Sequence, residues 1–262
     1  MAVVGGSAQI SGASIIRGYA LVEGRASVSG NSIVEGNAKV LDAATISENS
    51  HVYGNSVIKD SAKLFDDAVA YGNATIYGQA KVYNNAQVFG RSYVSGSAKI
   101  SDNAQIFGNA QVTVFADISG DSIISGKAYV AGGSVVKGKV TITDNARIDI
   151  VKPGLIDGDT LGQGITISGD SVVEYFPTIT DNVSIYGEAL ILGEVVLSDH
   201  ANIFGQASIY GNATVSGTAS VSGLAQVYER ALISGDSELS GDVIVRGSLE
   251  INTGIYTRGQ HF

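Results

Sequence analysis

The sequence predicts an all-β protein folded as a single parallel β-solenoid, and three regularities with a period of six residues predict it. An aliphatic residue recurs at every sixth position, a small residue precedes it by two positions, and a turn-forming residue follows it by two. Because alternate residues of a strand point to the same side, the small residue and the aliphatic anchor share one inward face. Gly, Asp and Asn tolerate turn conformations, so each hexad is expected to be a short strand followed by a corner.

The aliphatic anchors run without a break through the first half of the chain, and only Ala70 departs from Val, Ile or Leu. A hexad cannot bury its apolar side alone, whereas stacked coils can, so a run of this length indicates a solenoid. The anchors are Val4, Ile10, Ile16, Val22, Val28, Val34, Val40, Ile46, Val52, Ile58, Leu64, Ala70, Ile76, Val82, Val88, Val94, Ile100, Ile106, Val112, Ile118, Ile124, Val130, Val136, Ile142 and Ile148.

A second run follows in a register shifted by one residue, from Ile167 to Ile251, and Leu155 and Leu161 are expected to fill the anchor places between the runs. Residues 1–252 are therefore predicted to form the solenoid, with an irregular bulge or loop at 149–166, and residues 253–262 a C-terminal tail. Three hexads per coil would give about 14 coils of 18 residues. The anchors of the second run are Ile167, Val173, Ile179, Ile185, Ile191, Leu197, Ile203, Ile209, Val215, Val221, Val227, Ile233, Leu239, Val245 and Ile251.

The number of hexads in a coil is left open by the repeat itself, because two per coil would give a flatter, two-sided solenoid. Outward aromatic residues favour three, since more pairs of them are 18 residues apart than 12. The pairs 18 apart are Tyr53–Tyr71, Tyr71–Phe89, Phe89–Phe107, Phe65–Tyr83, Tyr186–Phe204 and Tyr210–Tyr228. The pairs 12 apart are Phe65–Tyr77, Tyr53–Phe65, Tyr71–Tyr83 and Tyr77–Phe89.

Units such as 82–87 (VYNNAQ) and 106–111 (IFGNAQ) resemble those of the bacterial hexapeptide-repeat family, whose members form left-handed parallel β-helices. The second position departs from the family pattern, with Tyr, Phe or Ser where Gly is common. The resemblance covers nearly the whole chain and implies a left-handed triangular β-helix. For function, the resemblance implies acyltransferase activity with an acyl-CoA donor, a His general base and a trimeric assembly. This chain is closer to family members described as transferases that have no clear catalytic apparatus.

Composition and charge narrow the classes of function. The net charge of −9 disfavours nucleic acid as a partner, because an acidic surface repels phosphate backbones. The absence of Cys excludes disulfides and thiolate metal sites. No apolar run approaches the ~20 residues that span a bilayer, and no signal peptide opens the sequence, so no membrane association and a cytoplasmic location are expected.

Candidate catalytic residues are few. Acyl transfer requires a general base, and His51, His200 and His261 are the histidines of the chain. Each is expected to be a solvent-facing polar residue, and no catalytic residue is assigned. His200 is the best of the three, because it occupies a corner, and Asp199 is beside it. The aspartates Asp42, Asp60, Asp66 and Asp102 are interpreted as turn residues, so neither a metal site nor a cofactor is predicted.

Outward aromatic residues are the stronger candidates for a functional surface. With three hexads per coil, Tyr53, Tyr71, Phe89 and Phe107 are expected to stack on one face in four successive coils. Such a ladder stiffens the solenoid, and a contiguous apolar stripe also marks interfaces; a platform for sugars is the least favoured interpretation. The first hexad begins at Ala2, so the open end is expected to be capped by a partner or another copy, or to continue in a longer protein.

Two functions are therefore carried forward. The first is a non-enzymatic structural or interaction protein, a rigid scaffold that presents flat faces to copies of itself or to a protein partner. The alternative is an acyltransferase of the hexapeptide-repeat family that uses acyl-CoA, which rests on fold analogy alone.

Overall fold

The computed structural model describes residues 1–159 and 161–258, and within them every regular element is a β-strand. These residues form a parallel β-solenoid of about 14 turns of roughly 18 residues, as the sequence predicts. Most strands are two residues long, and their first residue points outward while the second is buried. The chain divides into two compact units, residues 1–127 and residues 128–262.

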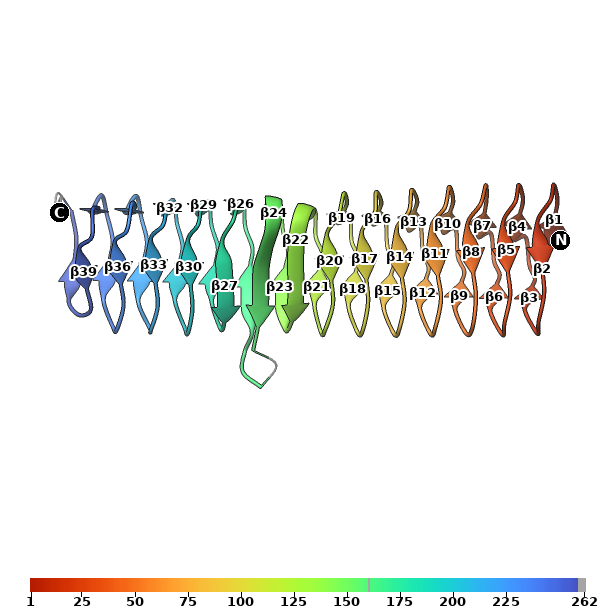
Figure 1. The fold of residues 1–262 in the computed structure, drawn as a ribbon, viewed down its shortest axis with the longest axis horizontal. Coiled ribbons are helices and arrows are strands. Elements are labelled where there is room, and N and C mark those ends of the chain that lie inside the picture. Colours follow the sequence, from red (N-terminus) through yellow and green to blue (C-terminus); the bar gives the residue numbers. More distant parts are fainter. Residues whose placement is uncertain (160, 259–262) are drawn as a thin grey trace. The chain divides into compact units, whose positions relative to one another are not determined.

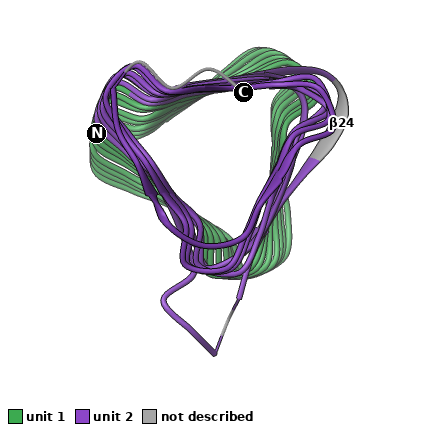
Figure 2. Ribbon diagram, turned by 90° about the vertical axis from the view of Figure 1, so that its left-hand side faces the viewer, with its two compact units in different colours: residues 1–127 green, residues 128–262 purple. Residues whose placement is uncertain are grey.

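Unit 1 has three faces, each a ladder of parallel strands, and Figure 2 shows its triangular outline in green. The first face contains β1 (Val3–Val4), β4 (Leu21–Val22), β7 (Lys39–Val40), β10 (Val57–Ile58), β13 (Thr75–Ile76), β16 (Tyr93–Val94) and β19 (Gln111–Val112). The second contains β2 (Gln9–Ile10), β5 (Ser27–Val28), β8 (Thr45–Ile46), β11 (Lys63–Leu64), β14 (Lys81–Val82), β17 (Lys99–Ile100) and β20 (Asp117–Ile118). The third contains β3 (Ile15–Ile16), β6 (Ile33–Val34), β9 (His51–Val52), β12 (Val69–Ala70), β15 (Gln87–Val88), β18 (Gln105–Ile106) and β21 (Ile123–Ile124).

Unit 2 repeats this arrangement with longer strands near its start (Figure 1). Its first face contains β22 (Tyr129–Gly138), β24 (Arg147–Gly158), β26 (Val172–Tyr175), β29 (Leu190–Gly193), β32 (Ser208–Gly211), β35 (Gln226–Val227) and β38 (Ile244–Val245). From the end of β24 the second face continues through β27 (Thr178–Asp181), β30 (Val196–Leu197), β33 (Thr214–Val215), β36 (Leu232–Ile233) and β39 (Glu250–Ile251). The third contains β23 (Val140–Ile142), β25 (Ile165–Ile167), β28 (Ser184–Ile185), β31 (Asn202–Ile203), β34 (Ser220–Val221), β37 (Glu238–Leu239) and β40 (Ile255–Tyr256).

The strand register decides how many hexads make a coil. In unit 1 each strand pairs with the strand 18 residues further on, as Val57 does with Thr75. Backbone bonds follow the same rule, since the amide of Val57 donates to the carbonyl of Ala74 at 2.9 Å. Three hexads therefore form each coil, and the two-sided alternative is excluded.

Each inward position has its own packing role. The aliphatic anchors from Val22 to Ile148 are fully buried, and the Ala residues two positions earlier are buried as well. Where Ser replaces Ala, its hydroxyl donates to the carbonyl three residues before it, as Ser50 does to Ser47 at 2.7 Å. This bond satisfies a polar group that burial would otherwise leave unpaired, which explains why the small position accepts Ala or Ser.

The corners explain the turn residues of the repeat. The residue two positions after the anchor has a positive φ, about +60° at Asp42, Asp60 and Asp66, and this conformation favours Gly, Asn and Asp. These carboxylates also accept backbone amides of the next coil, as Asp60 does from Gly78 at 2.9 Å. The turn interpretation of the aspartates is therefore supported by their geometry. Asn side chains of adjacent coils also bond to one another, as in Asn37–Asn55–Asn73.

The irregular segment lies in unit 2 and differs in detail from the expectation. The pairing of β22 with β24 shifts between Gly132 and Ser134, and Val140 pairs with Ile165, so this coil contains 25 residues instead of 18. The prediction that Leu155 and Leu161 are anchors is wrong. Ile156 is buried in place of Leu155, and Leu161 is 97% exposed in the connection between β24 and β25.

The end of β24 and the segment after residue 252 contain two further features of unit 2. Asp159 follows β24 directly; it is half-buried, and its carboxylate accepts the amide of Leu161 at 2.9 Å. The side chains of residues 152–154 lie outside the described part of the chain. Within the segment predicted as a tail, β40 continues the third face of unit 2 by pairing with β37.

Candidate functional site

The aromatic ladder forms on the third face of unit 1, where each ring belongs to the residue directly after a strand. The ring centroids are 5.0 Å apart for Tyr53–Tyr71, 4.7 Å for Tyr71–Phe89 and 4.8 Å for Phe89–Phe107. The planes of neighbouring rings are within 10° of parallel. The predicted stack of these four residues is confirmed, because strands in register place equivalent side chains one coil apart.

The stacking geometry distinguishes between the three functions considered for this ladder: stiffening, an interface and a sugar platform. The rings cover one another's faces and are half-buried, so their edges point outward. Burial within the stack, followed by the neighbouring Tyr53, raises the pKa of Tyr71 above its ordinary value. A platform for sugars requires exposed ring faces, and this arrangement therefore favours the stiffening ladder and the interface over the sugar platform.

The outward strand positions beside Tyr71, Phe89 and Phe107, and in the coil after them, are uncharged. Outward residues of β12, β15, β18 and β21 on this face are Val69, Gln87, Gln105 and Ile123. Depletion of charge at the centre of a surface is the compositional sign of a protein interface. The aromatic face, meaning the ladder together with these four residues, can be covered without burying an unpaired charge.

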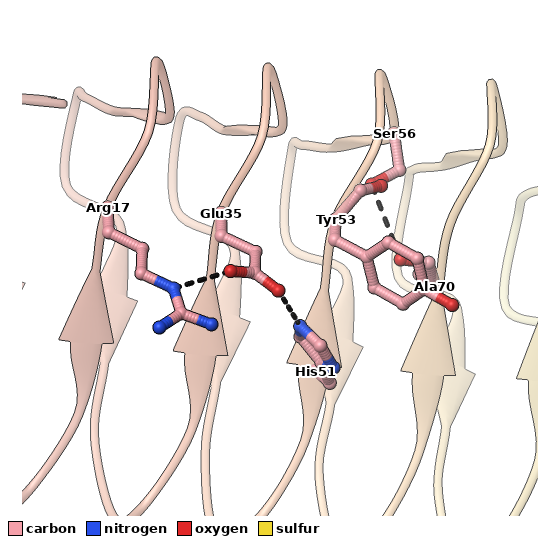
Figure 3. A network of polar contacts seen from close by, with 6 residues as sticks. All are labelled: Arg17, Glu35, His51, Tyr53, Ser56 and Ala70. Atoms are coloured by element: carbon pink, nitrogen blue, oxygen red, sulfur yellow. Dashed lines mark hydrogen bonds and ion pairs between the residues drawn. The ribbon is translucent and has the colours of Figure 1, made fainter. Parts of the chain in front are cut away.

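A polar network continues the ladder toward the N-terminus (Figure 3). Arg17 and Glu35 occupy the ladder position in the two coils before Tyr53, and the Arg17 Nε donates to a carboxylate oxygen of Glu35. The other Glu35 oxygen is 2.9 Å from Nε2 of His51. The His51 ring lies 4.5 Å from the Tyr53 ring at an angle of 37°. The network therefore joins an ion pair to the end of the aromatic stack.

This network is not among the sites predicted from the sequence. The sequence predicts a solvent-facing His51, but the residue is half-buried and has a carboxylate partner. The signal was the 18-residue spacing of Arg17, Glu35 and Tyr53, which becomes informative only when a coil is known to contain three hexads. The hydrogen bond from Arg17 is the largest influence that lowers the pKa of Glu35 below its ordinary value of 4.5, and His51 contributes in the same direction.

This pKa shift predicts a pH-dependent effect for Glu35→Gln. A carboxylate with a lowered pKa stabilises the folded state above its unfolded pKa, and this contribution is lost as the pH falls through the folded value. The variant is expected to be slightly less stable than wild type at neutral pH, by the small amount typical of exposed ion pairs. The difference should disappear in acid, which urea denaturation at several pH values measures. A constant difference at all pH values would contradict this assignment.

Among the described residues, His200 has no setting comparable to that of His51. His200 is exposed at a corner, as expected, but Asp199 does not orient its ring. The Asp199 carboxylate instead accepts the amide of Gly217 at 2.9 Å, in the next coil. His261 lies outside the described residues. Over the part of the chain that the structure describes, no group of His, Asp and Glu side chains is arranged to hold a metal ion.

Shorter aromatic stacks occur on the second face of unit 1 and on the third and first faces of unit 2. In unit 1, Phe65 and Tyr83 stack at 5.0 Å on the second face. In unit 2, Tyr186–Phe204 and Tyr210–Tyr228 stack at 5.0 and 4.7 Å. All are one coil apart, so stacking of outward rings is a general property of this solenoid and the four-ring ladder is its longest described example.

Comparison with known protein families shows a similarity to a repeat family. Residues 207–223 are similar to the YdcK beta-solenoid repeat, a family defined by its repeat. No curated protein matches the chain. The match covers one coil and supports a β-solenoid repeat protein, whereas the resemblance to hexapeptide-repeat transferases is not confirmed by it. Among the residues that the structure describes, no helix is long and apolar enough to cross a membrane.

Proposed function

We propose that this chain is a non-enzymatic interaction scaffold, a stiff β-solenoid whose aromatic face binds a second copy of the chain. The single observation that supports this proposal is the uncharged aromatic face of unit 1, with four stacked rings in successive coils. A second copy is the preferred occupant because two such faces can meet without desolvating an unpaired charge.

The energetics allow this association. The ladder extends for about 15 Å along the coil axis at ~4.8 Å per coil. Partial burial of its ring edges and of the flanking apolar side chains contributes about 25 cal/mol per Å², before the costs of association. The net charge of −9 on each copy opposes assembly, but salt screens this repulsion.

Light scattering at moderate salt tests the proposal. Wild-type protein is expected to have a mass at least twice that of the 26.9 kDa chain, and the Tyr71→Asp, Phe89→Asp double variant is expected to be monomeric. The new carboxylates would have to be desolvated at the interface, which is strongly unfavourable. Circular dichroism checks that the variant remains folded.

A control variant adds the same charge elsewhere. Thr45→Asp with Thr75→Asp places two carboxylates on outward positions of the second and first faces. This variant is expected to keep the wild-type mass. A monomeric wild type would contradict the proposal, and an assembly that survives the Tyr71 and Phe89 substitutions would exclude the aromatic face as its interface.

One observation favours the alternative, an acyltransferase. Glu35 is within hydrogen-bond distance of His51 and would orient the ring as a general base, as acyl transfer requires. This alternative is distinguished by titration with acetyl-CoA, using His51→Ala and His200→Ala as the two variants. Binding that is lost in either variant would contradict the scaffold proposal, whereas absence of binding at millimolar concentrations supports it.

A further inference from the structure

Three lysines stand in register on the second face of unit 1. Lys63, Lys81 and Lys99 are the first residues of β11, β14 and β17, and the register pairs Lys63 with Lys81 and Lys81 with Lys99. All three side chains are exposed, because the first strand position points outward. Successive coils therefore place three ammonium groups in one column.

This column is electrostatically unfavourable by itself. Like charges directly opposite each other on adjacent strands destabilise a sheet. Lys99 has one acidic neighbour, Asp117, at 3.7 Å. Within residues 1–159 and 161–258, no carboxylate lies within ion-pair distance of Lys63 or Lys81. A chain with a net charge of −9 thus keeps two adjacent ammonium groups without a carboxylate partner, and a bound anion would remove their repulsion.

The lysines line a surface groove of about 350 Å³. Its other lining residues are Ser61, Gln79 and Ser97, each two positions before a lysine. Every coil thus contributes one ammonium group and one hydroxyl or amide group, and the set is repeated three times. Phe65 and Tyr83 follow their lysines by two residues, so they also point outward, and their rings stack on each other with centroids 5.0 Å apart.

The same pair of groups, one ammonium and one hydroxyl or amide, recurs in each coil of the groove, and this recurrence indicates the chemistry of its ligand. We propose that the lysine groove binds a short, linear acidic oligosaccharide, with one carboxylate on each ammonium group and sugar hydroxyls on Ser61, Gln79 and Ser97. The coil spacing of ~4.8 Å is comparable to the length of one sugar unit, so successive units can meet successive coils. A volume of this size is at the lower end of the range for small-ligand sites.

Two features favour a saccharide over a nucleic acid. Single-stranded nucleic acids bind by stacking bases on aromatic faces, but the Phe65 and Tyr83 rings face each other, with planes 1° from parallel. The corner beyond these rings is acidic, with Asp66, Asp67 and Asp102 lining the adjacent groove. A long polyanion would meet this corner and the net negative charge, whereas a trimer on the lysine column would not.

Calorimetric titration with trigalacturonic acid at low salt tests this inference on the whole chain. The wild type is expected to bind, and the triple variant Lys63→Gln, Lys81→Gln, Lys99→Gln to bind at least about tenfold more weakly. The neutral trimer maltotriose is expected to bind neither protein. Saturating trigalacturonic acid should also raise the Tm of the wild type and leave the Tm of the variant unchanged, because only a ligand of the folded state stabilises it.

A charge-matched variant tests whether weaker binding results merely from a general loss of positive charge. Lys39→Gln, Arg91→Gln, Lys127→Gln removes three cations from other positions of unit 1 and is expected to bind like the wild type. Equal weakening in both triple variants, absence of binding to the wild type, or tighter binding of a single-stranded DNA oligomer of equal charge would each overturn the proposal.

Discussion

Replacement of Ile106 by alanine is expected to lower the free energy of unfolding by about 2–5 kcal/mol, the range for large-to-small changes in a core. Ile106 is fully buried in β18, and the register places it between Val88 of β15 and Ile124 of β21. The truncated side chain therefore leaves a cavity that faces two coils of unit 1, and each coil loses contacts. Urea denaturation monitored by circular dichroism measures this loss of unfolding free energy.

The neighbouring residue provides the control. Gln105 is the outward residue of the same strand, so Gln105→Ala removes a comparable volume without opening the core. Its effect is expected to stay within about 0.5 kcal/mol. Because solenoids unfold through nearest-neighbour interactions, the denaturant slope must be compared between variants before free energies are compared. Equal losses for Ile106→Ala and Gln105→Ala would contradict the inward assignment of the anchors.

Replacement of Gly132 by alanine is expected to be similarly damaging in unit 2. Gly132 has a φ of +68°, and a Cβ at this position would lie 1.8 Å from the carbonyl oxygen of Ile150. The positive φ is unfavourable for a side chain, and the clash is with backbone that the paired strands β22 and β24 hold in place. A loss of about 2–4 kcal/mol is expected, which thermal and urea denaturation would detect.

Gly5 serves as the matched glycine for this substitution. Its φ is not positive, and an added Cβ would meet only the flexible side chain of Glu23, at 3.8 Å. Gly5→Ala is therefore expected to be neutral or slightly stabilising, because alanine restricts the unfolded chain more than glycine does. If Gly132→Ala were as well tolerated as Gly5→Ala, the close approach of β22 and β24 at this bulge would be disproved.

The irregular segment at 149–166 shows where prediction from the six-residue pattern fails. Leu155 and Leu161 satisfy the six-residue count, but the structure buries Ile156 and exposes Leu161. Counting anchors in steps of six assumes that every hexad is a short strand followed by a corner, whereas β24 is a 12-residue strand. The length of such a strand depends on the backbone bonds offered by the coils on either side, and these bonds are not encoded in the segment itself.

The sequence by itself determined the strand-and-corner repeat, the inward anchors and the turn residues, because each depends on contacts and backbone conformations within one hexad. With three hexads per coil assumed, the sequence also predicted which four rings form the ladder. The tertiary structure decided that number through the 18-residue register of the backbone bonds. Only the tertiary structure brought Arg17, Glu35 and His51 together. It also aligned Lys63, Lys81 and Lys99 in one column. The physical reason is that the number of residues in a coil, and not the six-residue period of the repeat, decides which side chains are neighbours in adjacent coils.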